Sequence, residues 1–177
     1  MKLRHTLAIT TMMAALFIQP ACATPDIQAG FSPEGSAQQL IIRTISDAGQ
    51  EIRLMGYAFT SPEIARALTD ARKRGVDVRV VLDAESNDNK YSRAVINTLV
   101  LAGIPVRTVS SYKILHDKVI ITDRTNVETG SFNFSRAASR ANSENAIVLR
   151  NAPDIAETYL KHWQSRWEQG QAWTLPY

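Results

Sequence analysis

A histidine and a lysine lie two residues apart in the stretch ILHDKVIITDRTNVETGSFNFS, residues 114–135. Residues two apart on a β-strand point to the same face of the sheet, so His116 and Lys118 are predicted to project together. An imidazole and an ammonium group then share one small patch. A Gly-Ser-x-Asn turn follows a dozen residues later and brings Ser131 and Asn133 into the same stretch.

These residue types suit the cleavage of a phosphodiester without a metal ion. Such a reaction needs a nucleophile, neutralisation of the phosphoryl oxygens and an acid for the departing alkoxide. Neutral His116 can attack phosphorus, while Lys118 and the Asn133 amide are donors for the non-bridging oxygens. Ser131, or a backbone N–H near Gly130, can add another donor. Beyond residue 23, no carboxylate cluster or Cys/His set has metal-ligand spacing, so neither a metal site nor a cofactor is predicted.

Each of these residues also has an ordinary structural explanation when it is taken alone. A single histidine beside an apolar strand is usually packed or solvated, and a single lysine usually protects an exposed sheet edge. The combined pattern reverses that expectation for His116 and Lys118. His162 is not part of a comparable motif. Around it, Tyr159, Trp163 and Trp167 recur at helical spacing. We therefore expect that stripe to serve packing or an interface, and we assign His162 no catalytic role.

The elements that must position these residues alternate along residues 24–177. Strands are predicted at 27–31, 51–59, 76–84, 104–109, 118–123, 127–132 and 145–150, with a tight turn around 124–126. Helices are predicted from Ser32 and Pro33 to Gly49, from the N-cap Ser61 to Gly75, over 91–102 and over 153–169. This order predicts an α/β fold, a mixed β-sheet flanked by helices on both faces, in a single domain of ordinary size.

The first 23 residues are predicted to be a signal peptide. MKLRH is basic, TLAITTMMAALFI is apolar, and ACA supplies small residues for cleavage after Ala23. The apolar run is shorter than the roughly 20 residues that span a bilayer, which disfavours a membrane anchor. Lipid attachment at Cys22 is a second alternative, although the preceding QPA lacks the usual leucine. We expect a periplasmic or secreted protein with domain residues 24–177.

Export would change the charge and the cysteine content of the chain. Lys2 and Arg4 would leave with the signal, so the 20 basic residues fall to 18, against 17 acidic residues. A nearly neutral protein needs a local basic patch to bind a polyanion. One candidate is ARKRG at residues 71–75, although such a run is more often a solvated helix end. Cys22, the single cysteine, would also leave, and no disulfide would remain.

Six residues match one family signature with every spacing intact. The pattern H-x-K-x4-D-x6-G-S-x-N is formed by His116, Lys118, Asp123, Gly130, Ser131 and Asn133. With this pattern the chain resembles the phospholipase D superfamily. GFSPEG near the start, one motif instead of two, and the short exported chain are similar to the small dimeric bacterial endonucleases of that superfamily. The resemblance covers nearly all of residues 24–177 and implies a phospholipase D-like nuclease fold.

The resemblance also implies roles for individual residues. It suggests that Glu144, just before a predicted strand, holds the second ring nitrogen of His116, and that Asp123 and Gly130 are structural. The family's double displacement uses two histidines, but this chain has one H-x-K and would lose His5 with the signal. The second histidine must then come from another copy, so the resemblance implies a homodimer with a shared active site.

Three functions remain open on the sequence. The first is a metal-independent endonuclease that cleaves DNA with little sequence preference through a phosphohistidine, with activity on RNA left open. The second is a phospholipase D-type lipid phosphodiesterase, since both substrates present a phosphodiester. We rank it lower because residues 24–177 show no apolar membrane-docking helix, and no stable membrane association is expected. The third is a non-catalytic nucleic-acid-binding dimer.

Overall fold

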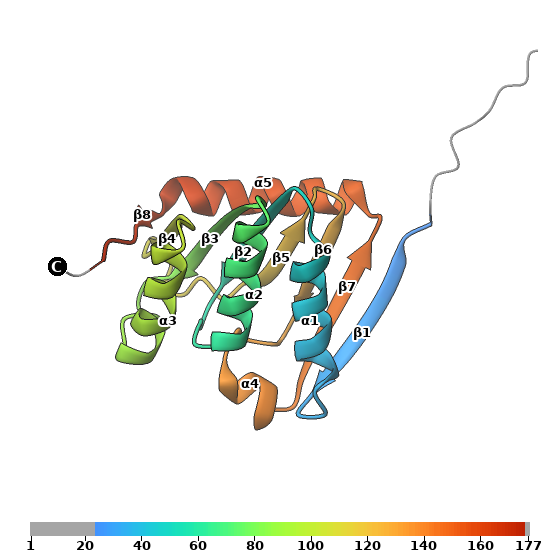
Figure 1. The fold of residues 1–177 in the computed structure, drawn as a ribbon, viewed down its shortest axis with the longest axis horizontal. Helices are drawn as coiled ribbons and strands as arrows, with labels where there is room; N and C mark the ends of the chain where they lie inside the picture. The colour runs from blue at the N-terminus through green and yellow to red at the C-terminus, as the bar shows by residue number, and fades with distance from the viewer. Residues whose placement is uncertain (1–23, 176–177) are drawn as a thin grey trace, which may run out of the picture.

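One mixed β-sheet organises the protein (Figure 1). The structure, a computed structural model, describes residues 24–175, and the predicted signal peptide lies outside them. The strands are β1 Asp26–Ser32, β2 Glu51–Gly56, β3 Asp77–Asp83, β4 Val106–Val109, β5 Lys118–Thr122, β6 Asn126–Gly130, β7 Glu144–Arg150 and β8 Gln171–Ala172. They are hydrogen-bonded in the order β1-β7-β6-β5-β2-β3-β4-β8. Only β2, β3 and β4 pair in parallel.

Helices cover both faces of this sheet, as the sequence predicted. They are α1 Ser36–Asp47, α2 Pro62–Lys73, α3 Lys90–Leu101, α4 Arg136–Arg140 and α5 Pro153–Gln169. In Figure 1, α1, α2 and α3 lie side by side in front of the sheet, while the long α5 runs across the strands. Two separate clusters of buried side chains match this layering, one beneath α1 to α3 and one beneath α5.

Strand alternation supplies both clusters from the same strands. Along β5, Ile120 packs with the α1–α3 cluster, while Val119 and Ile121 pack with the α5 cluster. This is the period of two that a strand buried on both faces requires. Trp163 of α5 is fully buried and donates its indole N–H to the Leu54 carbonyl at 2.9 Å. The predicted aromatic stripe of α5 therefore packs on the sheet.

The local signals located α2 and α5 correctly and α1 less well. Ser61 caps α2 by accepting from the Ile64 N–H, with Pro62 at the first position, as predicted. The prediction that α1 begins at Ser32 and Pro33 was wrong. Ser32 ends β1 and pairs with Glu144 across the sheet, and the helix begins only at Ser36. The short α4 and β8 were not predicted.

Strand direction places several strand ends at one edge of the sheet. Because β2 and β5 are antiparallel, Gly56 at the end of β2 pairs with Lys118 at the start of β5. The end of β6 lies beside the start of β7 for the same reason, and Ser32 at the end of β1 pairs with Glu144. The segments before β5 and after β6, which carry the chemical motif, therefore meet at this edge.

Candidate functional site at the edge of the sheet

His116 lies in the extended segment just before β5, with an exposed side chain. β5 begins at Lys118, as the predicted strand 118–123 does, so the same-face argument, which assumed that His116 lies within the strand, was wrong for His116. Its ring lies against Tyr57, with 4.8 Å between the ring centroids and a tilt of 56°. Within residues 24–175, no hydrogen bond forms to the His116 ring, which leaves both nitrogens open to a substrate or a partner.

Lys118 lies beside this histidine but is buried. Its Nζ donates to the His116 carbonyl oxygen at 2.7 Å and lies 5.3 Å from the centre of the Tyr57 ring. Burial lowers the pKa of Lys118, while the carboxylates of Asp117 and Glu144 act in the opposite direction. A poorly solvated ammonium group gains more from a phosphoryl anion than an exposed one does.

Tyr57 was not singled out from the sequence, although its ring contacts both motif residues. It follows the last residue of β2, inside the segment 51–59 that was predicted as a strand. Its position directly after an apolar run was the only available signal. The aromatic ring restricts the space around His116 and provides a face for the Lys118 ammonium group.

The Gly-Ser-x-Asn turn is held in place by its neighbours. Phe132 and Phe134 are fully buried in the α1–α3 cluster, so Asn133 stands between two anchored side chains. The Asn133 Oδ1 atom is itself buried, without a hydrogen-bond partner among the described residues. A side chain at position 130 would place its Cβ 2.3 Å from the Asn145 carbonyl oxygen, so only glycine fits there.

Glu144 and Ser131 are joined across the start of β7. The Ser131 hydroxyl donates to the Glu144 carboxylate at 2.5 Å and accepts from the Asn145 N–H at 3.1 Å. The other Glu144 oxygen accepts from the Asn142 amide at 2.9 Å. Glu144 is thus placed at the site and near Lys118. The predicted roles of Glu144 as orienter of His116 and of Ser131 as a phosphoryl donor stay predictions.

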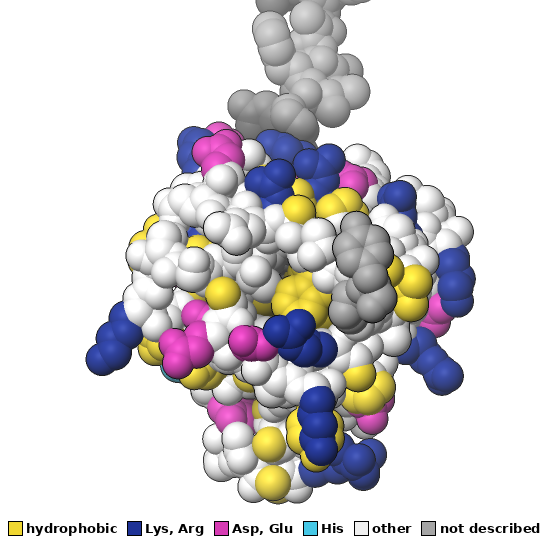
Figure 2. All heavy atoms as spheres, turned by 90° about the vertical axis from the view of Figure 1, so that its left-hand side faces the viewer, with side chains coloured by type: hydrophobic (Ala, Val, Ile, Leu, Met, Phe, Trp, Pro, Cys, Tyr) yellow, Lys and Arg dark blue, Asp and Glu magenta, His cyan; other side chains and the backbone are white. Residues whose placement is uncertain are grey.

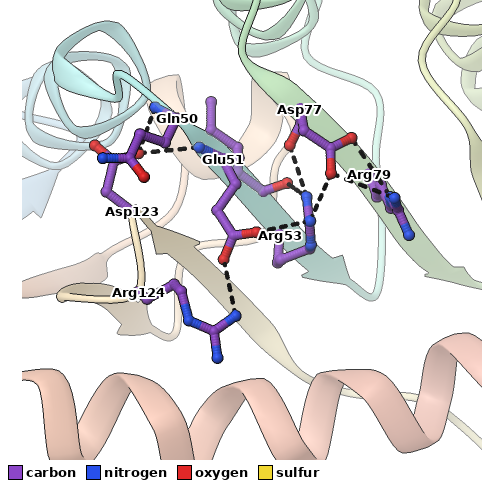
Figure 3. A network of polar contacts seen from close by, with 8 residues as sticks. Gln50, Glu51, Arg53, Asp77, Arg79, Asp123 and Arg124 are labelled. Atoms are coloured by element: carbon purple, nitrogen blue, oxygen red, sulfur yellow. Dashed lines mark hydrogen bonds and ion pairs between the residues drawn. The ribbon is translucent and has the colours of Figure 1, made fainter.

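Asp123 lies at the opposite end of β5 from Lys118. Its carboxylate accepts three backbone N–H groups, from Gly49, Gln50 and Glu51, at 2.7–3.0 Å. Figure 3 shows this carboxylate clamping the start of β2, beside the ion pairs of Arg53. Asp123 therefore connects the β5–β6 turn to β2. The full length of β5 separates Asp123 from His116.

His162 is directed toward a different residue of the motif segment. Its Nε2 lies 3.3 Å from an Asp117 carboxylate oxygen. Asp117 stands between His116 and Lys118 in the chain, and its partner comes from α5 on the far face of the sheet. His162 thus connects α5 to the segment before β5. It does not join His116 and Lys118.

A buried carboxylate that the sequence analysis missed supports the segment carrying His116. Asp83, the last residue of β3, accepts the N–H of Leu115 at 2.8 Å and the N–H of Ser86 at 2.7 Å. Leu115 is buried and directly precedes His116. An acidic residue at the end of an otherwise apolar predicted strand was the signal for this role.

The described residues 24–175 show two features that concern metal binding and membranes. No three His, Cys, Asp or Glu side chains are grouped so that they could hold a metal ion. None of the helices in this part of the chain has the length and apolarity to cross a bilayer.

Comparison with known proteins identifies the family to which the chain belongs. Residues 41–167 match the family described as cardiolipin synthase, PLD-like domain. Nuc from Salmonella typhimurium, a phospholipase D family member, has the same fold with a TM-score of 0.84 and 51% identity. The alignment covers 85% of this chain and 99% of Nuc.

Two sets of curated relatives carry lipid-related names. A phospholipase D from Rickettsia bellii is 38% identical over 77% of this chain and 66% of its own length. A mitochondrial cardiolipin hydrolase from Xenopus laevis is 32% identical over 85% of this chain and 67% of its own length. The chain thus spans about two thirds of these relatives. Motif spacing, sheet topology and the extent of these matches agree that the chain belongs to the phospholipase D superfamily of phosphodiesterases.

Proposed function

We propose that the protein is a metal-independent endonuclease that cleaves DNA with little sequence preference, as a homodimer with a shared site. The observation that carries this proposal is that exposed His116, buried Lys118 and Asn133 lie at the same end of the paired strands β5 and β6. This edge offers a free imidazole beside donors for phosphoryl oxygens. Such phosphate-directed contacts carry no information about the bases.

In the proposed first step, a neutral ring nitrogen of His116 attacks phosphorus. The phosphorus–oxygen bond to the leaving group breaks, and Lys118 and the Asn133 amide stabilise the charge that develops on the non-bridging oxygens. The leaving oxygen takes a proton from the imidazolium of His116 of the partner subunit. That imidazole, now neutral, removes a proton from water. The resulting hydroxide attacks phosphorus, and the phosphorus–nitrogen bond breaks to restore His116.

The position of His162 supports the requirement for two subunits. Residues 24–175 contain two histidines, and His162 is engaged by Asp117 3.3 Å away. Its helix packs against the face of the sheet opposite α1 to α3. A second imidazole at the reacting phosphate is therefore supplied best by an identical subunit, related by two-fold symmetry.

The basic run at residues 71–75 does not contribute to the proposed DNA contacts. Arg74 instead donates to the carbonyls of Ser46 and Ala48 at the end of α1, and Lys73 pairs with Asp70. That run lies at the end of α2 farthest from the site, because Pro62 at the other end adjoins the motif turn.

A lipid phosphodiester is the second candidate substrate. The names of the phospholipase D and cardiolipin hydrolase relatives favour it, and the same catalytic groups would serve both substrates. An enzyme that acts on lipids would need to reach the headgroup of its substrate at a bilayer surface.

One experiment separates these functions. The purified domain is incubated with excess chelator and, separately, with plasmid DNA, RNA and phospholipid vesicles, beside its His116→Ala variant. We expect plasmid cleavage by the unaltered domain alone. Rapid vesicle turnover with intact plasmid would overturn the proposed substrate. Loss of all activity on chelation would overturn the metal-free mechanism.

A further inference from the structure

A second feature of the site edge is an open groove of about 570 Å³ beside the motif turn. It lies between the beginnings of α2 and α3 and is lined by Thr60, Pro62, Lys90, Tyr91, Ala94, Val95 and Arg136. None of these residues belongs to the family signature. The groove has no assigned role in the mechanism above.

The groove is continuous with the catalytic turn. Arg136 on its wall follows Asn133 by three residues. The backbone N–H groups of Thr60 and Ser61 both donate to the Phe134 carbonyl, at 2.9 and 3.0 Å. The opposite wall of the groove is therefore hydrogen-bonded to the residue directly after Asn133. A chain whose phosphodiester lies at Asn133 needs to advance only a short distance to enter the groove.

An exposed aromatic ring and two cations determine what the groove can bind. Tyr91 is 67% exposed, although large aromatic side chains are usually covered. The Lys90 Nζ lies 5.0 Å from the centre of its ring. Figure 2, which faces α3 and β8, shows basic side chains standing beside and over hydrophobic ones at the lower end of that face. A flat ring beside positive charges is the usual platform for an unpaired base and its phosphate.

The charges at the groove remain available to a ligand. Within the part of the chain that the structure describes, neither Lys90 nor Arg136 forms an ion pair with a carboxylate. Two acidic residues close to the groove in the sequence already have partners, since Asp88 pairs with Arg93 and Glu63 lies 3.9 Å from Arg140. An anionic strand would therefore meet two unpaired cations, Lys90 and Arg136, in the lining of the groove.

We propose that this groove is a nucleotide subsite that holds the single strand next to the scissile phosphodiester, with one base stacked on Tyr91. Lys90 and Arg136 contact the flanking phosphates. The subsite rests on the proposed nuclease function and makes it more specific, because it favours unpaired over paired DNA. An acyl chain fits the groove less well, since Lys90 and Arg136 add two positive charges to its lining.

Tyr91→Ala and Tyr91→Phe test the stacking interaction. The kcat/KM for a single-stranded oligonucleotide of roughly 12 residues is divided by that for methyl p-nitrophenyl phosphate, a diester too small to reach the groove. In Tyr91→Ala this ratio is expected to fall about 5- to 100-fold, as for one lost base–aromatic stack. Tyr91→Phe keeps the ring and should keep the ratio. Leu101→Ala, at the exposed far end of α3, is the matched control and should change nothing.

Lys90→Ala tests the phosphate contact. It is expected to make the fall of log affinity with log salt concentration less steep by about 0.7, the value for one phosphate of a single strand. Lys73→Ala, a lysine at the far end of α2, should leave the slope unchanged.

Binding of a labelled oligonucleotide to the His116→Ala variant separates this subsite from the proposed function. DNA cleavage that is indifferent to Tyr91→Ala would overturn the subsite and leave the nuclease intact. Tyr91-dependent binding by the His116→Ala variant, together with an unaltered protein that cleaves no DNA, would support the subsite and overturn the nuclease. A loss confined to phospholipid micelles, or a change of oligomeric state in Tyr91→Ala, would instead assign the groove to lipid or to a subunit interface.

Discussion

The carboxylate of Asp83 accepts the backbone N–H of Leu115 at 2.8 Å, one residue before His116. Both residues are buried, and 32 positions separate them in the chain. The same carboxylate also closes the turn after β3 by accepting the Ser86 N–H. The buried Asp83 carboxylate therefore holds the segment that carries His116 at the end of β3.

Asp83→Asn is therefore expected to lower kcat more than it raises KM. The amide keeps one acceptor oxygen but faces two backbone donors, so one buried N–H loses its partner at a cost of about 1–3 kcal/mol. A shift of the His116 backbone can reduce the rate by up to about 10²-fold. Steady-state kinetics on DNA and thermal unfolding check this. Asp70→Asn, an exposed residue of α2, is the control. Equal kinetics for both variants would contradict the positioning role.

His116→Ala is expected to abolish turnover while folding and DNA binding are retained, because the donors for the phosphate remain. Lys118→Ala and Asn133→Ala should each reduce kcat by about 10²- to 10³-fold through loss of one donor. His162→Ala should keep most activity, since the His162 ring contacts Asp117.

Alkaline quenching and peptide mass analysis should locate a phosphoryl group on His116. Near-normal turnover by His116→Ala would exclude the mechanism, and an adduct on Ser131 would reassign the nucleophile.

Activity is expected to require a dimer, because each subunit brings one available histidine to the site. Sedimentation of the active domain should show two subunits at working concentrations. Dilution below the dissociation constant should reduce specific activity in parallel with the fraction of dimer. A strictly monomeric species with full activity would remove the argument for a shared site.

Glu128 makes the stability of the fold depend on pH. Its carboxyl is fully buried on β6 between Ile120 and Val148, and neither oxygen has a hydrogen-bond partner among residues 24–175. Burial raises the pKa of Glu128 well above its usual value of 4.5. The folded state therefore keeps a proton that the unfolded chain releases. Its contribution to stability is fully present below the unfolded pKa and is lost as pH rises through the folded pKa.

Glu128→Gln is expected to remove this pH dependence. The free energy of unfolding, measured in urea at about pH 5 and about pH 8, should fall more steeply for the unaltered protein than for the variant. Glu157→Gln, a change in the exposed part of α5, should keep the original slope. Parallel pH profiles for all three proteins would show that Glu128 does not titrate in this range.

Export is expected to leave a mature chain that begins at Thr24, in the periplasm or the medium of a bacterial host. Intact mass measurement of the functional protein decides this prediction. A retained Met1 would contradict cleavage, and a diacylated Cys22 would establish the lipid-anchored alternative.

The sequence by itself determined the family motif and the local elements. Short-range spacing specifies the H-x-K and G-S-x-N motifs, and Ser61 with Pro62 specifies the start of α2 through contacts within one turn. The continuous apolar run 119–121 in β5 indicates that both faces of the sheet are buried. These features depend on neighbours within a few positions, which is why they could be predicted.

The tertiary structure decided which distant residues complete the site. Tyr57 reaches His116 only because β2 and β5 pair antiparallel, with Gly56 opposite Lys118. The contacts of Asp83 with Leu115 and of Asp123 with the start of β2 likewise depend on strand order and register. Register is set by the packing of the whole sheet, and no local pattern of residue types encodes it. The position of His116 outside β5 and the groove beside Tyr91 follow from the same cause.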